Sequence, residues 1–159
     1  MNIHMIDHDL ANRFSYLEID EAVFEDAKYG WLFIRNELNA ILDRFYEKLD
    51  DFGHEDKITD LHELKLKQYR HWANLFSCSY SREYVDQVRR SGIAHKNIRL
   101  CQADLAIGYA FMVDEMVKVL ERRISDDPVR MVRTIRAVHK LASIDASIAF
   151  AAYEAVLID

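Results

Sequence analysis

The sequence predicts an all-α fold, and two observations support this prediction. Four glycines and one proline among 159 residues provide few of the turn signals that strands and hairpins need. In addition, apolar residues recur every three or four positions over long stretches, which is the periodicity of amphipathic helices. A chain of this length suffices for one domain with a substantial core. We therefore expect one helical domain over residues 20–159, preceded by an N-terminal tail over residues 1–19.

The first half of the chain contains three predicted helices. Asp20 suits the N-cap of a short helix that ends at Gly30, because aspartate accepts backbone N–H groups and glycine suits a helix C-terminus. The second helix covers about residues 31–49 and has a broad apolar face. The polar stretch DDFGHEDK then forms a loop, and Thr59 caps a third helix that ends near Ser77.

The second half also contains three predicted helices. Ser81 opens the fourth, in which the stretch RRSGIAHKNIRL lies in the middle, and the fifth covers about residues 102–124. Asp127 and Pro128 form a cap and first-turn pair for the last helix, which continues to about residue 157. Its stretch LASIDASIAFAAYEAV is apolar or small on nearly all sides. That pattern suits a central helix within one domain, or a helix buried on one side by a second subunit.

Charge and composition exclude several classes of function. The net charge of −6 argues against nucleic acid or an anionic membrane as a partner, because both reward clustered Lys and Arg. No apolar stretch reaches the roughly 18 residues that span a membrane, and the N-terminus lacks the apolar segment of a signal peptide, so we expect a cytoplasmic protein. Cys78 and Cys101 have no metal-ligand spacing. Without a nucleophile triad, a phosphate loop or a carboxylate pair, we expect no enzymatic activity.

His95 is an ionisable residue on the apolar face of the fourth predicted helix, where Val88, Gly92 and Ile98 share its side. Such a histidine is either a hydrogen-bonded core residue or a ligand. A mid-helix glycine costs about 1 kcal/mol relative to alanine, and we expect Gly92 to leave room for a flat group beside the imidazole. Ser91 offers its hydroxyl or its carbonyl to Nδ1, which would leave Nε2 free to bind a metal. These neighbours favour a ligand.

Tyr46 lies on the inward face of the second predicted helix. A buried tyrosine hydroxyl needs a hydrogen-bond partner. Taken with His95, it predicts a haem that His95 holds on one face while Tyr46 lies over the other face.

Several stretches, taken in order along the chain, resemble the globin-coupled sensors and the related protoglobins. These stretches are FY at residues 45–46, LKLKQYRHWANLFS at residues 64–77, and the pattern Y(x)7GxxH(x)4L formed by Tyr84, Gly92, His95 and Leu100. The segments YLEIDEAVFEDAKYG and IRNELNAILDRFYEKL resemble the family's N-terminal helix and B helix, and LASIDASIAFAAYEAV resembles its final helix. The resemblance covers nearly the whole chain. It implies a globin-like fold of the sensor type with an extra N-terminal helix.

The resemblance also assigns roles to residues of the site. It implies a non-covalent haem b, with His95 as the proximal ligand of its iron. Tyr46 matches the distal tyrosine that hydrogen-bonds bound O₂ in many members, and Leu64 matches an apolar distal residue. Lys67 replaces a threonine of some relatives, and we expect its ammonium to lie near a haem propionate or the gas ligand. The other residues expected to line the haem are Phe45, Val88, Ser91, Gly92, Ile98, Leu105 and Tyr109.

The function that the resemblance implies is a sensor of a diatomic gas, O₂ first but also CO or NO. Such a domain forms a homodimer through its last two helices and can precede a C-terminal output domain, which this sequence does not contain. A stand-alone protoglobin that binds or detoxifies O₂ or NO, and a haem-free globin-like regulatory module, remain alternatives. His62 or His71 could provide a second ligand for the haem iron. His4 and His8, with Asp7 between them, could form a separate metal site. We favour neither possibility.

Overall fold

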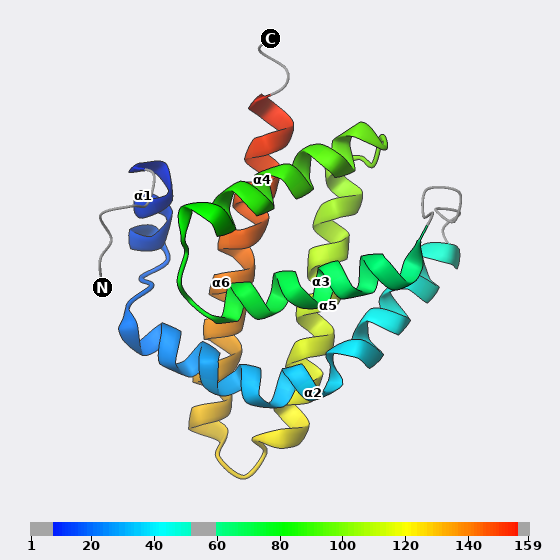
Figure 1. Ribbon diagram of the computed structural model, residues 1–159. Coiled ribbons are helices and arrows are strands. Elements are labelled where there is room, and N and C mark those ends of the chain that lie inside the picture. Colours follow the sequence, from blue (N-terminus) through cyan, green and yellow to red (C-terminus); the bar gives the residue numbers. More distant parts are fainter. Residues whose placement is uncertain (1–7, 52–59, 156–159) are drawn as a thin grey trace.

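The computed structural model describes residues 8–51 and 60–155, and over these residues it contains six helices and no strand (Figure 1). The helices are α1 (His8–Tyr16), α2 (Glu21–Asp51), α3 (Leu61–Phe76), α4 (Arg82–Asn97), α5 (Gln102–Arg123) and α6 (Pro128–Ala155). The all-α prediction is therefore confirmed. None of the described helices is long and apolar enough to cross a membrane.

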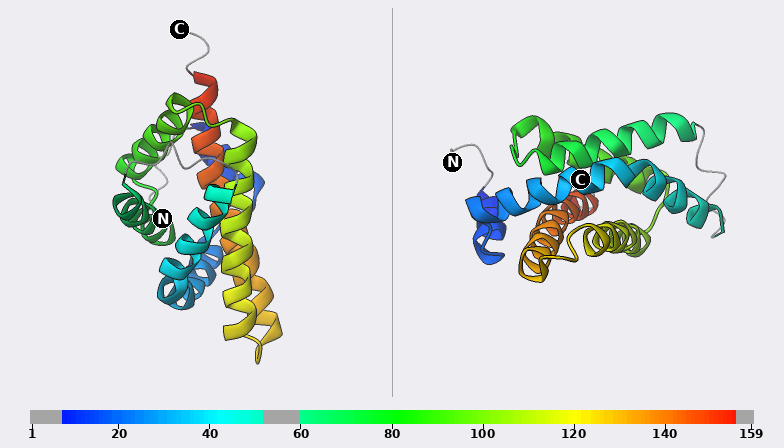
Figure 2. Two further views of the ribbon diagram at one scale, coloured as in Figure 1. Left: turned by 90° about the vertical axis from the view of Figure 1, so that its right-hand side faces the viewer. Right: turned by 90° about the horizontal axis from the view of Figure 1, so that it is seen from below.

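The last helix, α6, is the centre of the molecule and packs against all five other helices. In Figure 1, α5 and α6 run side by side while α3 and α4 cross in front of them, and both views of Figure 2 place α3 and α4 in a layer on one face of this pair. The apolar stretch of α6 contributes a row of nearly inaccessible side chains: Ala137, Val138, Leu141, Ala142, Ile144, Ile148 and Ala149. The position of α6 within its own chain thus explains why it is apolar on nearly all sides.

Three predicted helix starts are confirmed. The side chains of Asp20, Ser81 and Asp127 each accept a hydrogen bond from the backbone N–H three residues later, at 3.0 to 3.2 Å. Asp60, rather than Thr59, caps α3, with its carboxylate 3.0 Å from the N–H of Glu63. Thr59 and most of the predicted DDFGHEDK loop lie outside the described residues.

The prediction of two helices separated at Gly30 is wrong, because α2 continues through this residue. A Cβ atom on Gly30 would lie 2.7 Å from Cγ2 of Thr134, which belongs to α6. Only a residue without a side chain allows the two helices to cross this closely. Gly30 therefore permits a helix crossing and does not end a helix.

Part of the segment expected to be a tail forms α1. Its Leu10 and Phe14 are buried in the core, and the Phe14 ring lies edge-on to the ring of Tyr80 at 4.8 Å between centroids. The structure therefore adds α1 before the helix that was expected to come first. His4 and Asp7, members of the alternative metal site at the N-terminus, lie outside the described residues.

The expected reason for Gly92 also needs correction. A Cβ atom there would lie 2.5 Å from the carbonyl oxygen of Ala149 and 3.0 Å from Cβ of Ala152, both in α6. Gly92 thus makes room for a neighbouring helix and not for a flat group beside His95. Ala149 and Ala152 thus face α4 of the same chain, and Ala142 of α6 is also buried.

We expect Gly92→Ala to lower the free energy of unfolding by about 1–3 kcal/mol, because the added methyl group meets backbone and α4 must move away from α6. Urea denaturation followed by circular dichroism measures this loss. Gly108→Ala is the matched control: its Cβ atom would meet only the Phe45 ring, at 3.4 Å. The control should be neutral or stabilising by up to about 1 kcal/mol, the helix-propensity gain of alanine. Equal effects of the two substitutions would contradict the packing argument.

Candidate functional site

His95 is half-buried in the last turn of α4, and its ring is oriented by its own helix. Nδ1 lies 2.6 Å from the carbonyl oxygen of Ser91 and 3.5 Å from the Ser91 hydroxyl. A carbonyl only accepts hydrogen bonds, so Nδ1 carries the proton and donates it. Nε2 is then the nitrogen with a free lone pair, which is the form that binds a metal. Of the two acceptors that the sequence offered, the carbonyl is the closer.

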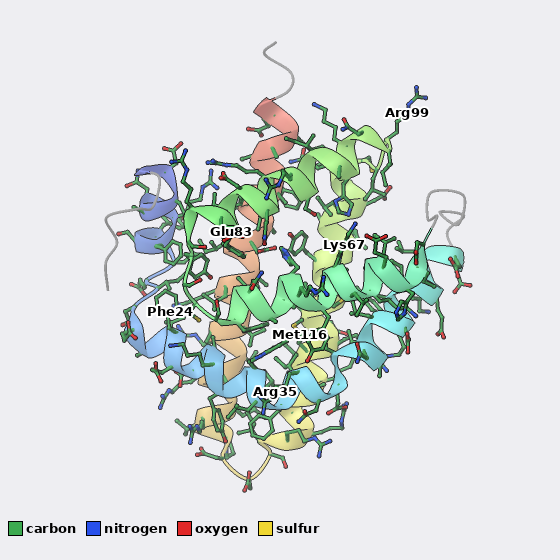
Figure 3. All side chains as sticks on the ribbon, in the orientation of Figure 1. Phe24, Arg35, Lys67, Glu83, Arg99 and Met116 are labelled. Atoms are coloured by element: carbon green, nitrogen blue, oxygen red, sulfur yellow. The ribbon has the colours of Figure 1, made fainter. Side chains whose placement is uncertain are left out.

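The backbone that carries His95 is fixed by the way in which α4 ends. The helix stops at Asn97, so the prediction that His95 lies mid-helix is wrong. The N–H of Leu100 donates to the His95 carbonyl at 3.1 Å, and the N–H of Arg99 donates to the Lys96 carbonyl at 2.9 Å. These two bonds form a Schellman motif, in which Arg99 takes the left-handed position with φ of 59°. Figure 3 shows the Arg99 side chain pointing away from the molecule there.

A further bond anchors this end of α4 to α6. Nζ of Lys96, the residue after His95, donates to the carbonyl oxygen of Tyr153 at 2.8 Å. The hydroxyl of Tyr153 in turn donates to the Leu100 carbonyl at 3.2 Å. Both sides of the α4 terminus are thus bonded to one residue of α6, which limits how His95 can move.

The residues predicted to share the His95 face have different environments. Val88 is fully buried in the core, and Gly92 packs against α6. Ile98 lies beyond the end of α4 and is 46% exposed. The α4 face is therefore buried at the Val88 end and accessible at the His95 end.

Tyr46 is a buried residue of α2, as predicted, with 5% of its surface exposed. Burial raises the pKa of its hydroxyl to about 12, so the phenol stays protonated at neutral pH. Within the described residues this hydroxyl makes no hydrogen bond, and neither a hydrogen bond nor a ring contact joins Tyr46 to His95. The neighbouring Phe45 ring lies 5.2 Å from the Tyr46 ring and 5.9 Å from the Phe111 ring of α5. Among the described side chains, the Tyr46 hydroxyl is thus a donor without an acceptor, next to aromatic rings.

The other predicted residues lie on α3 and α5. Leu64 and Leu105 are half-buried. Lys67 has a mainly exposed side chain, whose Nζ pairs with Glu63 Oε1 at 2.9 Å. Figure 3 shows Lys67 on the side of α3 that faces α4. The ammonium is therefore held at the surface of α3 by its own helix.

Tyr109 belongs to a buried polar cluster that sequence reasoning missed. The carboxylate of Asp145 in α6 has no exposed surface and accepts three hydrogen bonds from three other helices. His71 Nε2 of α3 and Tyr109 Oη of α5 each lie 2.7 Å from Oδ2, and the Tyr84 hydroxyl of α4 donates to Oδ1. We call these four residues the Asp145 cluster. It connects α3, α4, α5 and α6 at one carboxylate.

The cluster shifts the pKa values of its members. Burial, followed by the charge of Asp145, raises the pKa of Tyr84 and of Tyr109 well above the usual tyrosine value. Burial alone would lower the pKa of His71, but the charge of Asp145 and its hydrogen bond together raise it above the usual histidine value. The bond to Asp145 also occupies His71 Nε2, so this nitrogen is not free to act as a second iron ligand.

No cluster of metal-ligating side chains accompanies His95 in the described part of the chain. Among the side chains that the structure describes, no group of three or more His, Cys, Asp or Glu residues could hold a metal ion. Among the described residues, a metal at His95 would thus have one protein ligand, with Nε2 as the donor atom.

The fold and these sites can be compared with known proteins. The protoglobin family model matches residues 6–157 of the chain. A solved structure described as the globin domain of the Geobacter sulfurreducens globin-coupled sensor is similar, with a TM-score of 0.78 at 19% sequence identity. The alignment covers 94% of this chain and 99% of that chain. No curated protein sequence matches significantly. The likeness of the two structures confirms the globin-like fold.

We expect Tyr109→Phe to lower the free energy of unfolding by about 1.5–3 kcal/mol, because it removes a buried hydrogen bond to a charged acceptor. Tyr153→Phe is the matched control, since its hydroxyl donates to a neutral carbonyl, a bond worth about 0.5–1.5 kcal/mol. Urea denaturation of both variants at one pH provides the comparison. A smaller loss for Tyr109→Phe than for Tyr153→Phe would argue against a charged carboxylate at the centre of the cluster.

Proposed function

Because the chain belongs to the protoglobin family, and is thus a haem-binding globin, we propose that it senses a diatomic gas, O₂ first, through a haem b whose iron is bound by His95. One observation carries this proposal. The Nδ1–H of His95 donates to the Ser91 carbonyl at 2.6 Å, which directs the free lone pair of Nε2 away from its own helix. Such a bond fixes the tautomer and orientation in which Nε2 of His95 would bind the haem iron.

The residues present fit a haem. The donor set is the single imidazole of His95 at the accessible end of α4. Tyr46 supplies a buried, protonated hydroxyl without a partner among the described residues. When bound, the haem would supply an iron centre that binds O₂, CO or NO. Apolar side chains from three other segments, Leu64, Leu105 and Ile98, would cover its surface and exclude water.

The remaining predicted residues would contribute by their position around the haem site. Val88 and Gly92 hold α4 in the core and against α6, and so set the place of His95. Phe45 packs beside Tyr46 and limits the positions of its ring. Tyr109 is bonded to Asp145, so we propose that it lines the haem with its ring and not with its hydroxyl. Lys67 would exchange its bond with Glu63 for a propionate or the gas ligand.

A sensor must pass the ligand state to another part of the protein. The Lys96 ammonium bonds the α4 terminus to Tyr153 of α6, so a shift of His95 would displace α6 directly. We propose a homodimer through α5 and α6, where Ile107, Val129 and Val132 are the exposed apolar side chains. We propose that a C-terminal output domain would then receive the signal. Sedimentation velocity at micromolar concentration tests the dimer, and a monomeric wild type would contradict it.

Simple measurements distinguish two alternative functions from this proposal. A haem-free regulatory module of the same fold would purify without a Soret absorption band. A stand-alone protoglobin that binds or detoxifies O₂ or NO would have the band but no output domain in its reading frame. The free Nε2 of His95 and the Tyr46 hydroxyl, which has no partner among the described residues, favour a haem protein over the haem-free module.

We expect the wild type to bind haem with a Soret band and His95→Ala to lose that band or bind haem far more weakly, because the substitution removes the axial donor. Absorption spectra of the ferrous proteins measure this. His139→Ala is the control, since His139 is an exposed histidine of α6. An unchanged histidine-ligated spectrum in His95→Ala would exclude His95 as the ligand.

We expect Tyr46→Phe to accelerate O₂ dissociation by about ten- to a hundredfold and CO dissociation much less. O₂ gains partial negative charge on binding, and a hydrogen bond to a charged acceptor is worth about 1.5–3 kcal/mol, where about 1.4 kcal/mol is a factor of ten. Stopped-flow mixing measures both rates. Tyr16→Phe, at an 88% exposed tyrosine, is the control, and Lys67→Ala tests whether the ammonium shares the role. Equal acceleration of O₂ and CO dissociation would show that Tyr46 contributes only packing.

A further inference from the structure

Asp145 is the one ionisable side chain with no exposed surface among the residues that the structure describes. It lies on the central helix, in the middle of a stretch that is otherwise apolar or small. Burying a charge without partners is very unfavourable, so such a residue persists only when other groups compensate for it. Here the compensation comes from His71, Tyr84 and Tyr109, one from each of three other helices.

Two of these helices form opposite sides of the proposed haem site. His71 belongs to α3, the helix of Leu64 and Lys67, while Tyr84 belongs to α4, the helix of His95. The rings of His71 and Tyr84 are stacked with centroids 6.4 Å apart. Figure 1 shows α3 and α4 running across the α5–α6 pair and connected by a short loop at one end. A single carboxylate therefore bonds both helices to α6.

Of the cluster members, His71 has the ordinary pKa nearest to neutral pH, about 6.5. Burial and Asp145 raise the pKa of both tyrosine hydroxyls well above the usual value, so these stay protonated. The His71 side chain keeps 20% of its surface exposed, which allows proton exchange with solvent. The titratable groups around it are Tyr84 from α4, whose ring stacks on it, and Asp145 from α6, whose charge acts on it. Tyr109 from α5 bonds the same oxygen of Asp145 as His71 does.

We propose that Asp145 is a positioning residue of the haem site and that its bond to His71 is a proton-dependent tie that holds α3 on α6. This inference rests on the proposed function for its link to gas binding, but the tie itself belongs to the protein without haem. With His71 protonated, an imidazolium donates to the buried carboxylate. When His71 loses its second proton, the bond becomes that of a neutral imidazole and α3 is held less firmly.

The direction of the pH effect follows from the His71–Asp145 pair. Asp145 raises the pKa of His71 above the value of about 6.5 for an unfolded chain. The stabilisation is therefore complete below about pH 6.5 and is lost as the pH rises through the pKa of folded His71. Over that interval, each pH unit lowers the contribution of the tie to the equilibrium constant by up to about tenfold.

Amide hydrogen exchange of the haem-free protein, corrected for the intrinsic pH dependence, tests the tie between pH 6 and pH 9. In the wild type, protection of the α3 amides should fall by up to about tenfold per pH unit above pH 6.5. His71→Gln should be less protected at pH 6 and should lose this pH dependence. Asp145→Asn, which retains hydrogen-bonding capacity without the charge, should also lose it. His62→Gln, an exposed position of the same helix, is the control and should behave like the wild type.

A second measurement does not depend on stability. Two-dimensional NMR of the imidazole nitrogens should give a titration midpoint for His71 above 6.5 in the wild type and a lower midpoint in Asp145→Asn. A wild-type midpoint below 6.5 would overturn the proposal. It would also be overturned if His71→Gln retained the wild-type pH dependence of α3 protection, or if His62→Gln lost it.

Measurements on the haem-loaded protein distinguish a failure of this proposal from a failure of the proposed haem function. Absence of a Soret band in the wild type would refute the haem function, while the exchange and NMR results would still decide the tie. If haem binds, the pH profile of the O₂ off-rate should differ between the wild type and His71→Gln, because α3 carries Leu64 and Lys67. Identical profiles would refute the role of Asp145 in positioning the site.

Discussion

The close crossing of α4 and α6 at Gly92 is the constraint on which the site depends. Because the backbone of α4 lies directly on Ala149 and Ala152, the helix has little freedom to slide or rotate. The direction of the His95 ring follows from this placement together with the Ser91 carbonyl. A substitution at Gly92 would therefore change the position of His95 without making contact with its side chain.

Much of the fold could be predicted from the sequence, because the signals for it are local. Asp20, Ser81 and Asp127 are helix caps whose partners lie three residues away, and the helices after them have clear apolar periodicity. The main error in the predicted helices came from the interpretation of a glycine. The same residue type ends helices and allows helices to cross, and only the position of α6, more than 100 residues later in the sequence, decides between these roles at Gly30.

Parts of the candidate site could be predicted where the contacts join residues close in sequence, or where the sequence resembles a known family. The Ser91 acceptor lies one turn from His95, and the burial of Tyr46 follows from the apolar face of its helix. The bond between His71 and Asp145 joins residues 74 positions apart, which no periodicity reports. One signal was available: Asp145 is a charged residue in the apolar stretch LASIDASIAF, and a charge at such a position needs buried partners.

The position of α6 at the centre of the molecule has a consequence for biosynthesis. The helix that contacts all the others follows them in the sequence and leaves the ribosome after them, so α1 to α5 must wait for it before the core can close. Until then, the apolar faces that will cover α6 remain accessible to chaperones and to other nascent chains. Contacts between α1 and α6 also join distant parts of the sequence, which slows folding. The domain is therefore most vulnerable to aggregation during the interval before α6 has been synthesised.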